Sequence, residues 1–245
     1  MSRTGCQTLW VLRLALLATL MLMAAPLPSA AAAERGDRQL RWSGYTWVVR
    51  ATKGRANPGN NRWGDTRWNA RVRRDGALRL NISNGKAVEL IGPPTGYGTY
   101  RWVVQTDVRR VDPFRVIALF ARGTTGEQDV EFSRWGDPGE TSVGTWVSWR
   151  RRTRLAFGFF AVPGPPPYTV QITWRPRRTR YTVRDANRRL VLDQTYASSR
   201  AGRHVSPRLS YWIYPGHGSF GNRFTSKTKH PPVIVRDFSF SRLRR

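Results

Sequence analysis

The chain has 245 residues and a formal net charge of +27, with 42 lysines and arginines against 15 aspartates and glutamates. A charge of this size is typical of proteins that bind nucleic acids, anionic surfaces or acidic polymers. The arginines are scattered through every segment, however, so a solvated arginine-rich surface explains the charge as well as a polyanion site does. We therefore predict no specific nucleic-acid partner.

Residues 1–33 have the layout of a secretory signal peptide. Arg3 lies near the start, an apolar run covers 14–23, and small residues at 29–33 suit a cleavage site. The apolar run is shorter than the roughly 20 residues that span a bilayer, so we predict no transmembrane segment. A retained N-terminal anchor is the competing interpretation. Cleavage would leave residues 34–245 as a single domain without cysteine, secreted or periplasmic.

Residues 34–245 show the pattern of an all-β domain. Asp75-Gly76 and Asn84-Gly85 predict hairpin turns between neighbouring strands, and no segment of useful length shows the helical period. Many short strands at regular spacing predict a two-sheet antiparallel β-sandwich or jelly roll. Short alternating or aromatic-rich runs predict strands at 42–50, 67–73, 78–83, 87–91, 99–108, 116–121, 128–135, 145–149, 155–162, 169–174, 180–184, 190–193, 208–214 and 233–240.

Three carboxylates alternate in the segment 127–131. Because side chains on a strand alternate between faces, Glu127, Asp129 and Glu131 are expected on one face and Gln128 on the other, where a buried amide needs a hydrogen-bond partner. Like charges in one row make one another harder to ionise, which pushes their pKa values apart. In the competing interpretation, these acids only form ion pairs with arginines on a solvated sheet face.

Five segments together carry a likeness to a known family: 96–100, 127–132, 174–176, 209–212 and 233–240. They resemble, in the same order, glycoside hydrolase family 16, which includes lichenases, laminarinases, agarases and carrageenases. The resemblance implies a concanavalin-A-like jelly roll with a cleft on its concave sheet, and retaining hydrolysis of internal bonds in a β-linked polysaccharide. It also implies that Glu127 is the nucleophile, Asp129 its assistant and Glu131 the acid/base.

The spacing of the outer acids is compatible with that chemistry. Retaining glycosidases need two carboxyl groups about 5–5.5 Å apart. Two residues four apart on a strand have backbones roughly 13 Å apart, since each residue rises about 3.3 Å. Two glutamate side chains that lean toward each other can close much of this gap, whereas two aspartates could not.

Sugar rings stack on aromatic side chains, and three tryptophans and an asparagine are candidates for substrate binding. Trp135 has the parity of the three acids, and Trp212 lies where the family has a cleft tryptophan. Asn61 and Trp63 lie in a Gly/Asn/Pro-rich loop, which suits exposed binding residues. Packing in the core is the competing explanation for each tryptophan. We assign to the core Trp47, Trp102, Trp146, Trp149 and Trp174.

Other chemistries have little support in the sequence. The three histidines, at 204, 217 and 230, have no metal-ligand spacing, so we predict neither a metal nor a cofactor. The expected partner is a β-linked polysaccharide, which the arginine excess allows to be anionic, bound by a monomer. The alternative is a non-catalytic carbohydrate- or polyanion-binding protein on the same fold.

Overall fold

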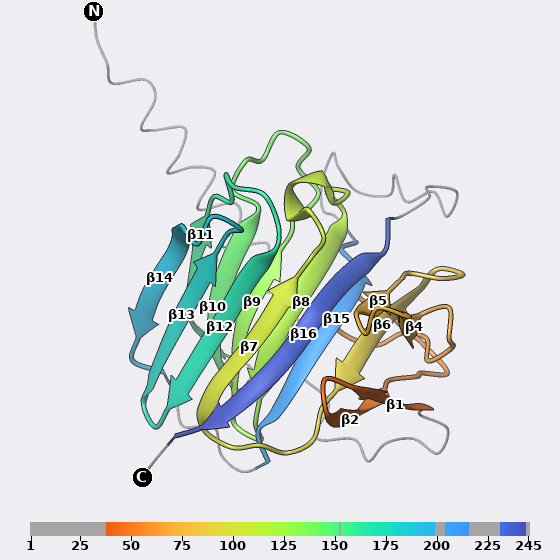
Figure 1. Cartoon of the computed structure of the whole chain (residues 1–245), viewed down its shortest axis with the longest axis horizontal. Coiled ribbons are helices and arrows are strands. Elements are labelled where there is room, and N and C mark those ends of the chain that lie inside the picture. Colours follow the sequence, from red (N-terminus) through yellow and green to blue (C-terminus); the bar gives the residue numbers. More distant parts are fainter. Residues whose placement is uncertain (1–37, 152, 199–203, 216–230, 244–245) are drawn as a thin grey trace, which may run out of the picture.

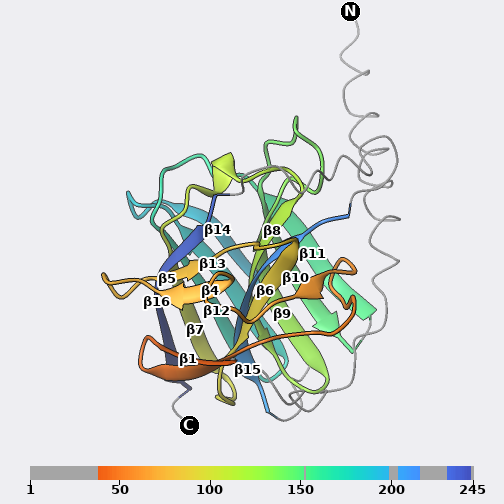
Figure 2. The ribbon, with the colours of Figure 1, turned by 90° about the vertical axis from the view of Figure 1, so that its right-hand side faces the viewer.

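The structure is a computed structural model that describes residues 38–151, 153–198, 204–215 and 231–243. The predicted signal peptide, 1–33, lies outside these ranges. Two antiparallel sheets pack face to face, as the two views in Figures 1 and 2 show. The expectation of an all-β, two-sheet sandwich is confirmed. In the ranges just given, no helix is long and apolar enough to cross a membrane.

The first sheet carries the acidic segment. Its order is β1 (Arg38–Trp42), β2 (Tyr45–Val49), β6 (Lys86–Ile91), β15 (Ser206–Ile213), β8 (Arg115–Arg122), β9 (Gly126–Phe132), β10 (Gly144–Arg150) and β11 (Thr153–Phe160), with β3 (Arg62–Trp63) parallel beside β6. Neighbours in this order come from distant parts of the chain, because β15 lies between β6 and β8.

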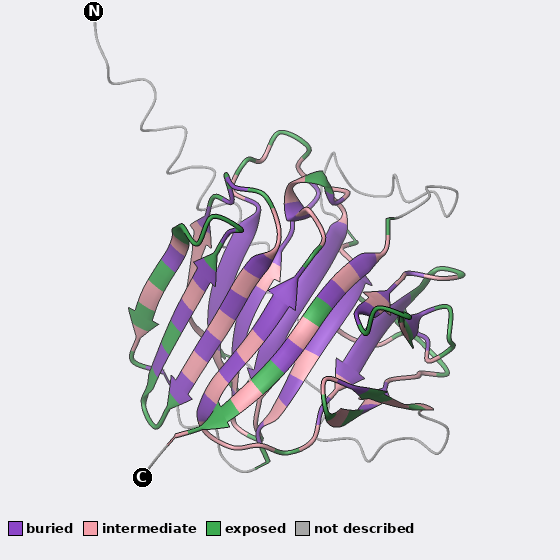
Figure 3. Cartoon of the chain, in the orientation of Figure 1, coloured by how far each residue is buried: buried purple, intermediate pink, exposed green. Residues whose placement is uncertain are grey.

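The second sheet covers the inner face of the first. Its order is β14 (Leu190–Tyr196), β13 (Arg178–Arg184), β12 (Tyr168–Arg175), β7 (Gly98–Val104), β16 (Val233–Arg242), β5 (Leu78–Leu80) and β4 (Ala70–Val72). A short 3-10 helix, Val108–Arg110, follows β7. Burial alternates along β12, β13 and β16, the pattern of strands with one face on the core and the other toward solvent (Figure 3).

The core lies between the two sheets and is rich in aromatic rings. From the first sheet, Val130 and Phe132 of β9 point into it. Phe132 packs against Tyr168 of the second sheet, with ring centroids 6.1 Å apart. These inward residues alternate with the acids of β9, so the core packing sets the register that holds the acids on the opposite face.

The strand boundaries differ from the sequence expectation in several places. The run 67–73 forms a strand only at Ala70–Val72, and the strand expected at 99–108 is Gly98–Val104. The run 42–50 is a hairpin rather than one strand, because Ser43 and Gly44 both take positive φ (50° and 78°) in a turn between β1 and β2. The two-residue strand β3 was not expected. The strand predicted at 128–135 runs from Gly126 to Phe132.

One of the two predicted hairpins is present. Asp75-Gly76 joins β4 to β5, with Gly76 at φ 80°. Asn84 and Gly85 both have positive φ, 52° and 67°. Positive φ at both central residues is the requirement of a type I′ turn. The expectation of a hairpin here is wrong, because this turn leads from β5 in one sheet to β6 in the other.

Candidate active site

The three acids of β9 lie in one row on the outer face of the first sheet. On β10, Trp149 lies opposite Glu127, and Thr145 lies opposite Glu131. Glu127 and Glu131 are half-buried, and Asp129 is 5% exposed. The alternation of the sequence is therefore expressed as a row of three partly covered carboxyl groups.

Gln128 points the other way, into the core, as its parity predicts. The Tyr181 hydroxyl of the second sheet donates a hydrogen bond to Gln128 Oε1. Gln128 itself is fully buried. This bond ties β9 to the facing sheet and gives the buried amide oxygen the partner that it needs.

Glu131 lies in the least cationic surroundings of the row. Burial, followed by the charge of Glu127, raises the pKa of Glu131 to about 8. Its neighbours across the two adjacent strands are Ala118 and Thr145, which carry no charge. At neutral pH this side chain is therefore mostly a carboxylic acid, which can donate a proton.

Glu127 has the opposite surroundings. Arg122, its cross-strand neighbour on β8, places Nε 3.2 Å from Glu127 Oε2. Burial holds the pKa of Glu127 above its ordinary value, although Arg122 and Arg208 act to lower it. Because two guanidinium groups stabilise its charge, Glu127 is the member of the pair better suited to be a carboxylate. The ion pair with an arginine that the competing interpretation expects is therefore present at this acid.

Asp129 lies between the two glutamates and feels the charge of both. Burial, followed by the charges of Glu127 and Glu131, raises the pKa of Asp129 well above its ordinary value. The indole Nε1 of Trp149 donates a hydrogen bond to Asp129 Oδ2 at 2.8 Å. In the described part of the chain, Asp129 Oδ1 has no hydrogen-bond partner. A protonated Asp129 can hold a proton between the two outer acids.

A fourth carboxylate, Glu89 of β6, lies on the same face and was not singled out from the sequence. It is 2% exposed, and it pairs with Arg50 Nη1 at 2.6 Å and Arg208 Nη1 at 2.8 Å. Burial acts to raise the pKa of Glu89, but Arg208 and Arg50 outweigh it and hold the pKa below its ordinary value. Glu89 is therefore a fixed anion that orients Arg208.

Trp149 is a second residue that sequence reasoning misplaced. It was assigned to the core, but its indole bonds Asp129 on the acid face, whereas Trp146 packs in the core. The two tryptophans are three residues apart on β10, so a regular strand has to put them on opposite faces. Strand parity was the signal that could have found Trp149.

Trp135 lies beside the row, although not for the reason given by parity. β9 ends at Phe132, and Trp135 has a positive φ of 51° in the turn that follows. Its indole Nε1 donates to Thr145 Oγ1 at 3.2 Å, next to Glu131. The ring is half-buried and makes an edge contact with Tyr214, with centroids 5.4 Å apart. Trp135 therefore keeps an accessible aromatic surface near the acids.

The expectation that Trp63 is exposed is wrong, and Asn61, the other binding candidate in this loop, is buried as well. Trp63 is 1% exposed, forms part of β3 and donates Nε1 to Ala56 O. Asn61 is 4% exposed, and its Nδ2 donates to Pro58 O and Ile213 O, both at 2.9 Å. These bonds fasten the Gly/Asn/Pro-rich loop to β15, so the polar residues of the loop serve its own backbone.

Trp212 lies on the acid face of the first sheet, as expected, but the loop that contains Gly59 covers it. It lies on β15, two residues from Ser210, which aligns through Ala118 with Glu131. A side chain at Gly59, which has φ +64°, would clash with Trp212 and with Ile213 O, each 2.7 Å from its Cβ. The close approach of this loop leaves Trp212 only 5% exposed. Trp212 packs edge-on against Trp135, with centroids 6.2 Å apart, and so supports that ring.

No group of three potential metal ligands occurs among the residues that the structure describes. His217 and His230 lie outside those residues. The acid row is itself a poor cation site, since burial favours protonation of Asp129 and Glu131.

Comparisons with known proteins agree with this architecture. No protein-family model and no curated protein matches the sequence. The structure is similar to Bacillus licheniformis β-glucanase, with a TM-score of 0.61, 17% identity, and coverage of 86% of this chain and 100% of that one. It is also similar to a family 16 endo-glucanase from Bacteroides ovatus, with a TM-score of 0.60, 10% identity, and coverage of 80% and 94%.

A third similar structure is an immunostimulatory antigen and pseudo β-1,3-glucanase of Mycobacterium tuberculosis. Its TM-score is 0.53 at 16% identity, covering 78% of this chain and 88% of that one. At these identities the likeness concerns the fold. The chain has the jelly-roll fold of glycoside hydrolase family 16.

Proposed function

We propose that the protein is a retaining glycoside hydrolase that cleaves internal bonds of a β-linked polysaccharide by double displacement. In this proposal Glu127 is the nucleophile, Glu131 the acid/base, and Asp129 the residue that shares a proton with them. The substrate lies along the outer face of the first sheet, with Trp135 as an aromatic support. Neither a metal nor a cofactor takes part.

The observation that carries the proposal is the difference between the two outer acids. Glu131 has a pKa of about 8, raised by burial and by Glu127, whereas Glu127 faces Arg122 and Arg208, which favour its charged form. Acid/base and nucleophilic roles require two carboxyl groups in electrostatically different environments, and Arg122 and Arg208 supply that difference at Glu127.

The first displacement uses both states at once. Protonated Glu131 donates its proton to the glycosidic oxygen as the bond to the anomeric carbon breaks. The Glu127 carboxylate attacks that carbon from the other side and forms the glycosyl ester. A proton held by Asp129 stabilises the charge on Glu127 before attack and the ester carbonyl after it.

The second displacement follows from the same electrostatics. Once Glu127 is esterified, its negative charge no longer raises the pKa of Glu131. Glu131, now a carboxylate, takes a proton from water, and the oxygen of that water attacks the anomeric carbon. The ester breaks, Glu127 leaves as a carboxylate, and Glu131 is again protonated.

The test is release of reducing ends from laminarin, lichenan, agarose, carrageenan and hyaluronan by the wild-type protein and by Glu127→Gln. We expect hydrolysis of at least one glycan by the wild type and loss of it in the variant, with an unchanged circular dichroism spectrum. Equal activity of the two proteins would refute the assignment of Glu127.

Export and oligomeric state are also part of the proposal. Removal of residues 1–33 during export would give a secreted or periplasmic single domain, 34–245, acting as a monomer. Mass spectrometry of the exported protein tests the first point, because it measures the new N-terminus directly. Light scattering of the same sample tests the second.

A second candidate is a glycan-binding protein without catalysis. The Arg122–Glu127 ion pair favours it, because a guanidinium on the nucleophile hinders its attack. One protein with a similar structure is called a pseudo-glucanase. Binding of a β-glycan without release of reducing ends, unchanged in Glu127→Gln, would select this candidate. Salt-sensitive binding of DNA and heparin-like polymers alike would instead indicate a general polyanion binder.

A further inference from the structure

We propose that Arg154, with Phe157 and Phe159, forms a subsite for an acidic sugar, so that the polysaccharide carries carboxylate or sulfate groups. This inference rests on the proposed function only in taking the outer face of the first sheet as the glycan-binding face. It adds the chemical class of the substrate and the side chains that recognise it.

The three residues lie on the acid face of the first sheet. Across β10, Arg154 aligns through Trp149 with Glu127. By the same registers, Phe157 aligns with Asp129, and Phe159 with Glu131. Two strand spacings separate β11 from β9, which is roughly 9–10 Å. The subsite is therefore close enough to the acid row for one oligosaccharide to reach both.

The two phenylalanines form an aromatic platform on β11, the edge strand of the first sheet. Both are half-buried, and their rings meet edge to face at 88°, with centroids 5.7 Å apart. The guanidinium carbon of Arg154 lies 4.1 Å from the centroid of Phe157. A sugar ring can pack on such apolar rings while an anionic substituent meets the guanidinium above them.

Arg154 is a partly desolvated cation that lacks a counter-ion. Its Nη1 is buried and has no hydrogen-bond partner, and none of the ion pairs in the described residues includes it. Burial lowers the pKa of Arg154. An unpaired charge that is partly removed from water is unfavourable, and the planar fork of a guanidinium matches the two oxygens of a carboxylate or sulfate.

The charge balance of the whole face points the same way. Burial and the neighbouring acids favour the neutral forms of Asp129 and Glu131. Even with Glu127 fully ionised, the described side chains near the acid row include two anions, Glu127 and Glu89, and four guanidinium groups, those of Arg50, Arg122, Arg154 and Arg208. The excess positive charge favours an anionic ligand over a neutral glucan.

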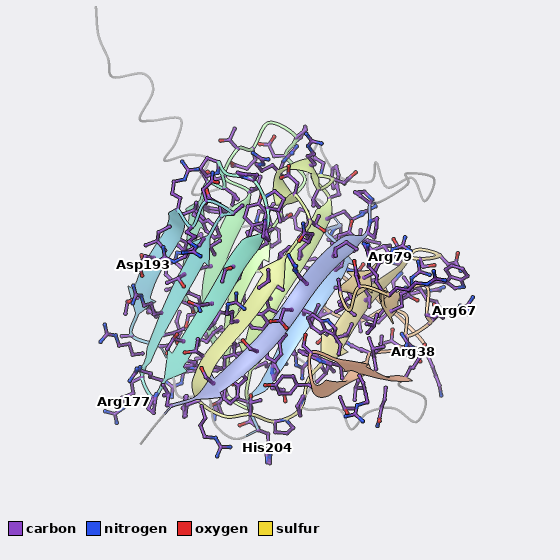
Figure 4. All side chains as sticks on the ribbon, viewed as in Figure 1. Arg38, Arg67, Arg79, Arg177, Asp193 and His204 are labelled. Atoms are coloured by element: carbon purple, nitrogen blue, oxygen red, sulfur yellow. The ribbon has the colours of Figure 1, made fainter. Side chains whose placement is uncertain are left out.

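The experiment measures binding separately from hydrolysis. Glu131→Gln serves as the background, because glutamine imitates the protonated acid and leaves the charge of the face unchanged while removing the acid/base. Calorimetry compares three forms of one β-glucan: neutral laminarin, laminarin oxidised to carry carboxylates, and sulfated laminarin. Arg154→Gln is introduced into this background. Arg177→Gln, on an exposed turn of the second sheet (Figure 4), is the control that removes the same charge elsewhere.

We expect one or both anionic laminarins to bind at least tenfold more tightly than the neutral form. Arg154→Gln should remove this preference and Arg177→Gln should keep it, since a hydrogen-bonded charge pair is worth roughly a tenfold to hundredfold change. The carboxylated and sulfated arms identify which group is recognised. Equal losses in the two variants would overturn the proposal, as would equally tight, Arg154-dependent binding of single-stranded DNA.

Thermal unfolding distinguishes recognition from support of the fold. Removal of an unpaired, desolvated charge should leave the Tm of Arg154→Gln unchanged or raised. A large fall in Tm, with equal weakening toward all three laminarins, would show that Arg154 is structural and would also overturn the proposal. If wild type hydrolyses none of the glycans but the binding pattern holds, the proposed hydrolase activity is refuted and the acidic-sugar subsite is supported. If wild type hydrolyses a glycan but Arg154→Gln does not change the binding preference, the subsite is refuted and the hydrolase activity is supported.

Discussion

Arg122 and Glu127 lie directly opposite each other on β8 and β9, and Arg122 Nε is 3.2 Å from Glu127 Oε2. This contact makes the two ends of the acid row chemically different. At Glu131 the pKa is shifted by burial and by Glu127, and no positively charged side chain of the described residues acts to lower it. The first prediction follows from it. In Arg122→Gln, the pKa of Glu127 should rise, so the acidic limb of the kcat/KM profile should move to higher pH.

That profile should be compared with the profile of Arg177→Gln, in which an exposed arginine far from the row is removed. A distant charge in 0.15 M salt is screened over about 8 Å, so this control should leave the acidic limb in place. An acidic limb that is the same in wild type and Arg122→Gln would show that the ion pair does not tune Glu127.

The alkaline side of the same profile should report Glu131. This group must be protonated to donate to the leaving oxygen, and its pKa is about 8. Activity should therefore fall as the pH rises through about 8. With an activated aryl glycoside, whose leaving group needs no proton, the first step of Glu131→Gln should lose this alkaline limb. A limb that persists in burst kinetics would assign it to another group.

Stability should depend on pH through the same residue. The pKa of Glu131 is raised above its ordinary value of 4.5, so the folded state binds the proton more tightly than the unfolded state. The stabilising effect is complete below about 4.5 and is lost as the pH rises toward about 8. Urea denaturation should show a smaller fall of unfolding free energy across this window in Glu131→Gln than in wild type.

Loss of the buried anion Glu89 should lower the free energy of unfolding far more than loss of an exposed acid that also pairs with arginine. Glu89→Gln leaves Arg50 and Arg208 without their shared partner, and breaking a buried pair costs about 3–5 kcal/mol. Asp193→Asn breaks an exposed pair with Arg180, and its effect should stay within about 1 kcal/mol. Asp193 lies at the outer edge of the second sheet (Figure 4). Equal losses of unfolding free energy in the two variants, measured by urea denaturation, would contradict the role of Glu89 as a buried anion that holds Arg50 and Arg208.

Two tryptophans near the row should respond in opposite ways to replacement by alanine. Trp63 is 1% exposed, and its removal should cost about 3–5 kcal/mol of unfolding free energy. Trp135 is half-buried beside Glu131, so Trp135→Ala should mainly raise KM, with a smaller loss of stability. Parallel measurement of KM and unfolding separates the two roles. A KM unchanged in Trp135→Ala would remove this residue from the substrate site.

Much of the fold and the acid row was predictable because it depends on local periodicity. The alternation in 127–131 predicted which side chains share a face, and the hydrogen bond from Tyr181 to Gln128 agrees with it. The same rule applied to β10 separates Trp146 from Trp149. Asn61 and Trp63 were misplaced because composition suggests a loop but does not say whether the loop packs back onto a strand.

The sequence by itself determined that three carboxyl groups share one strand face, since a period of two follows from backbone geometry alone. Only the tertiary structure decided what each carboxyl group does. Glu89 and Arg208 are 119 residues apart, and they meet only because β15 inserts beside β6. A pKa depends on the burial and charges within a few ångströms of a group, and strand order, not sequence distance, sets those neighbours.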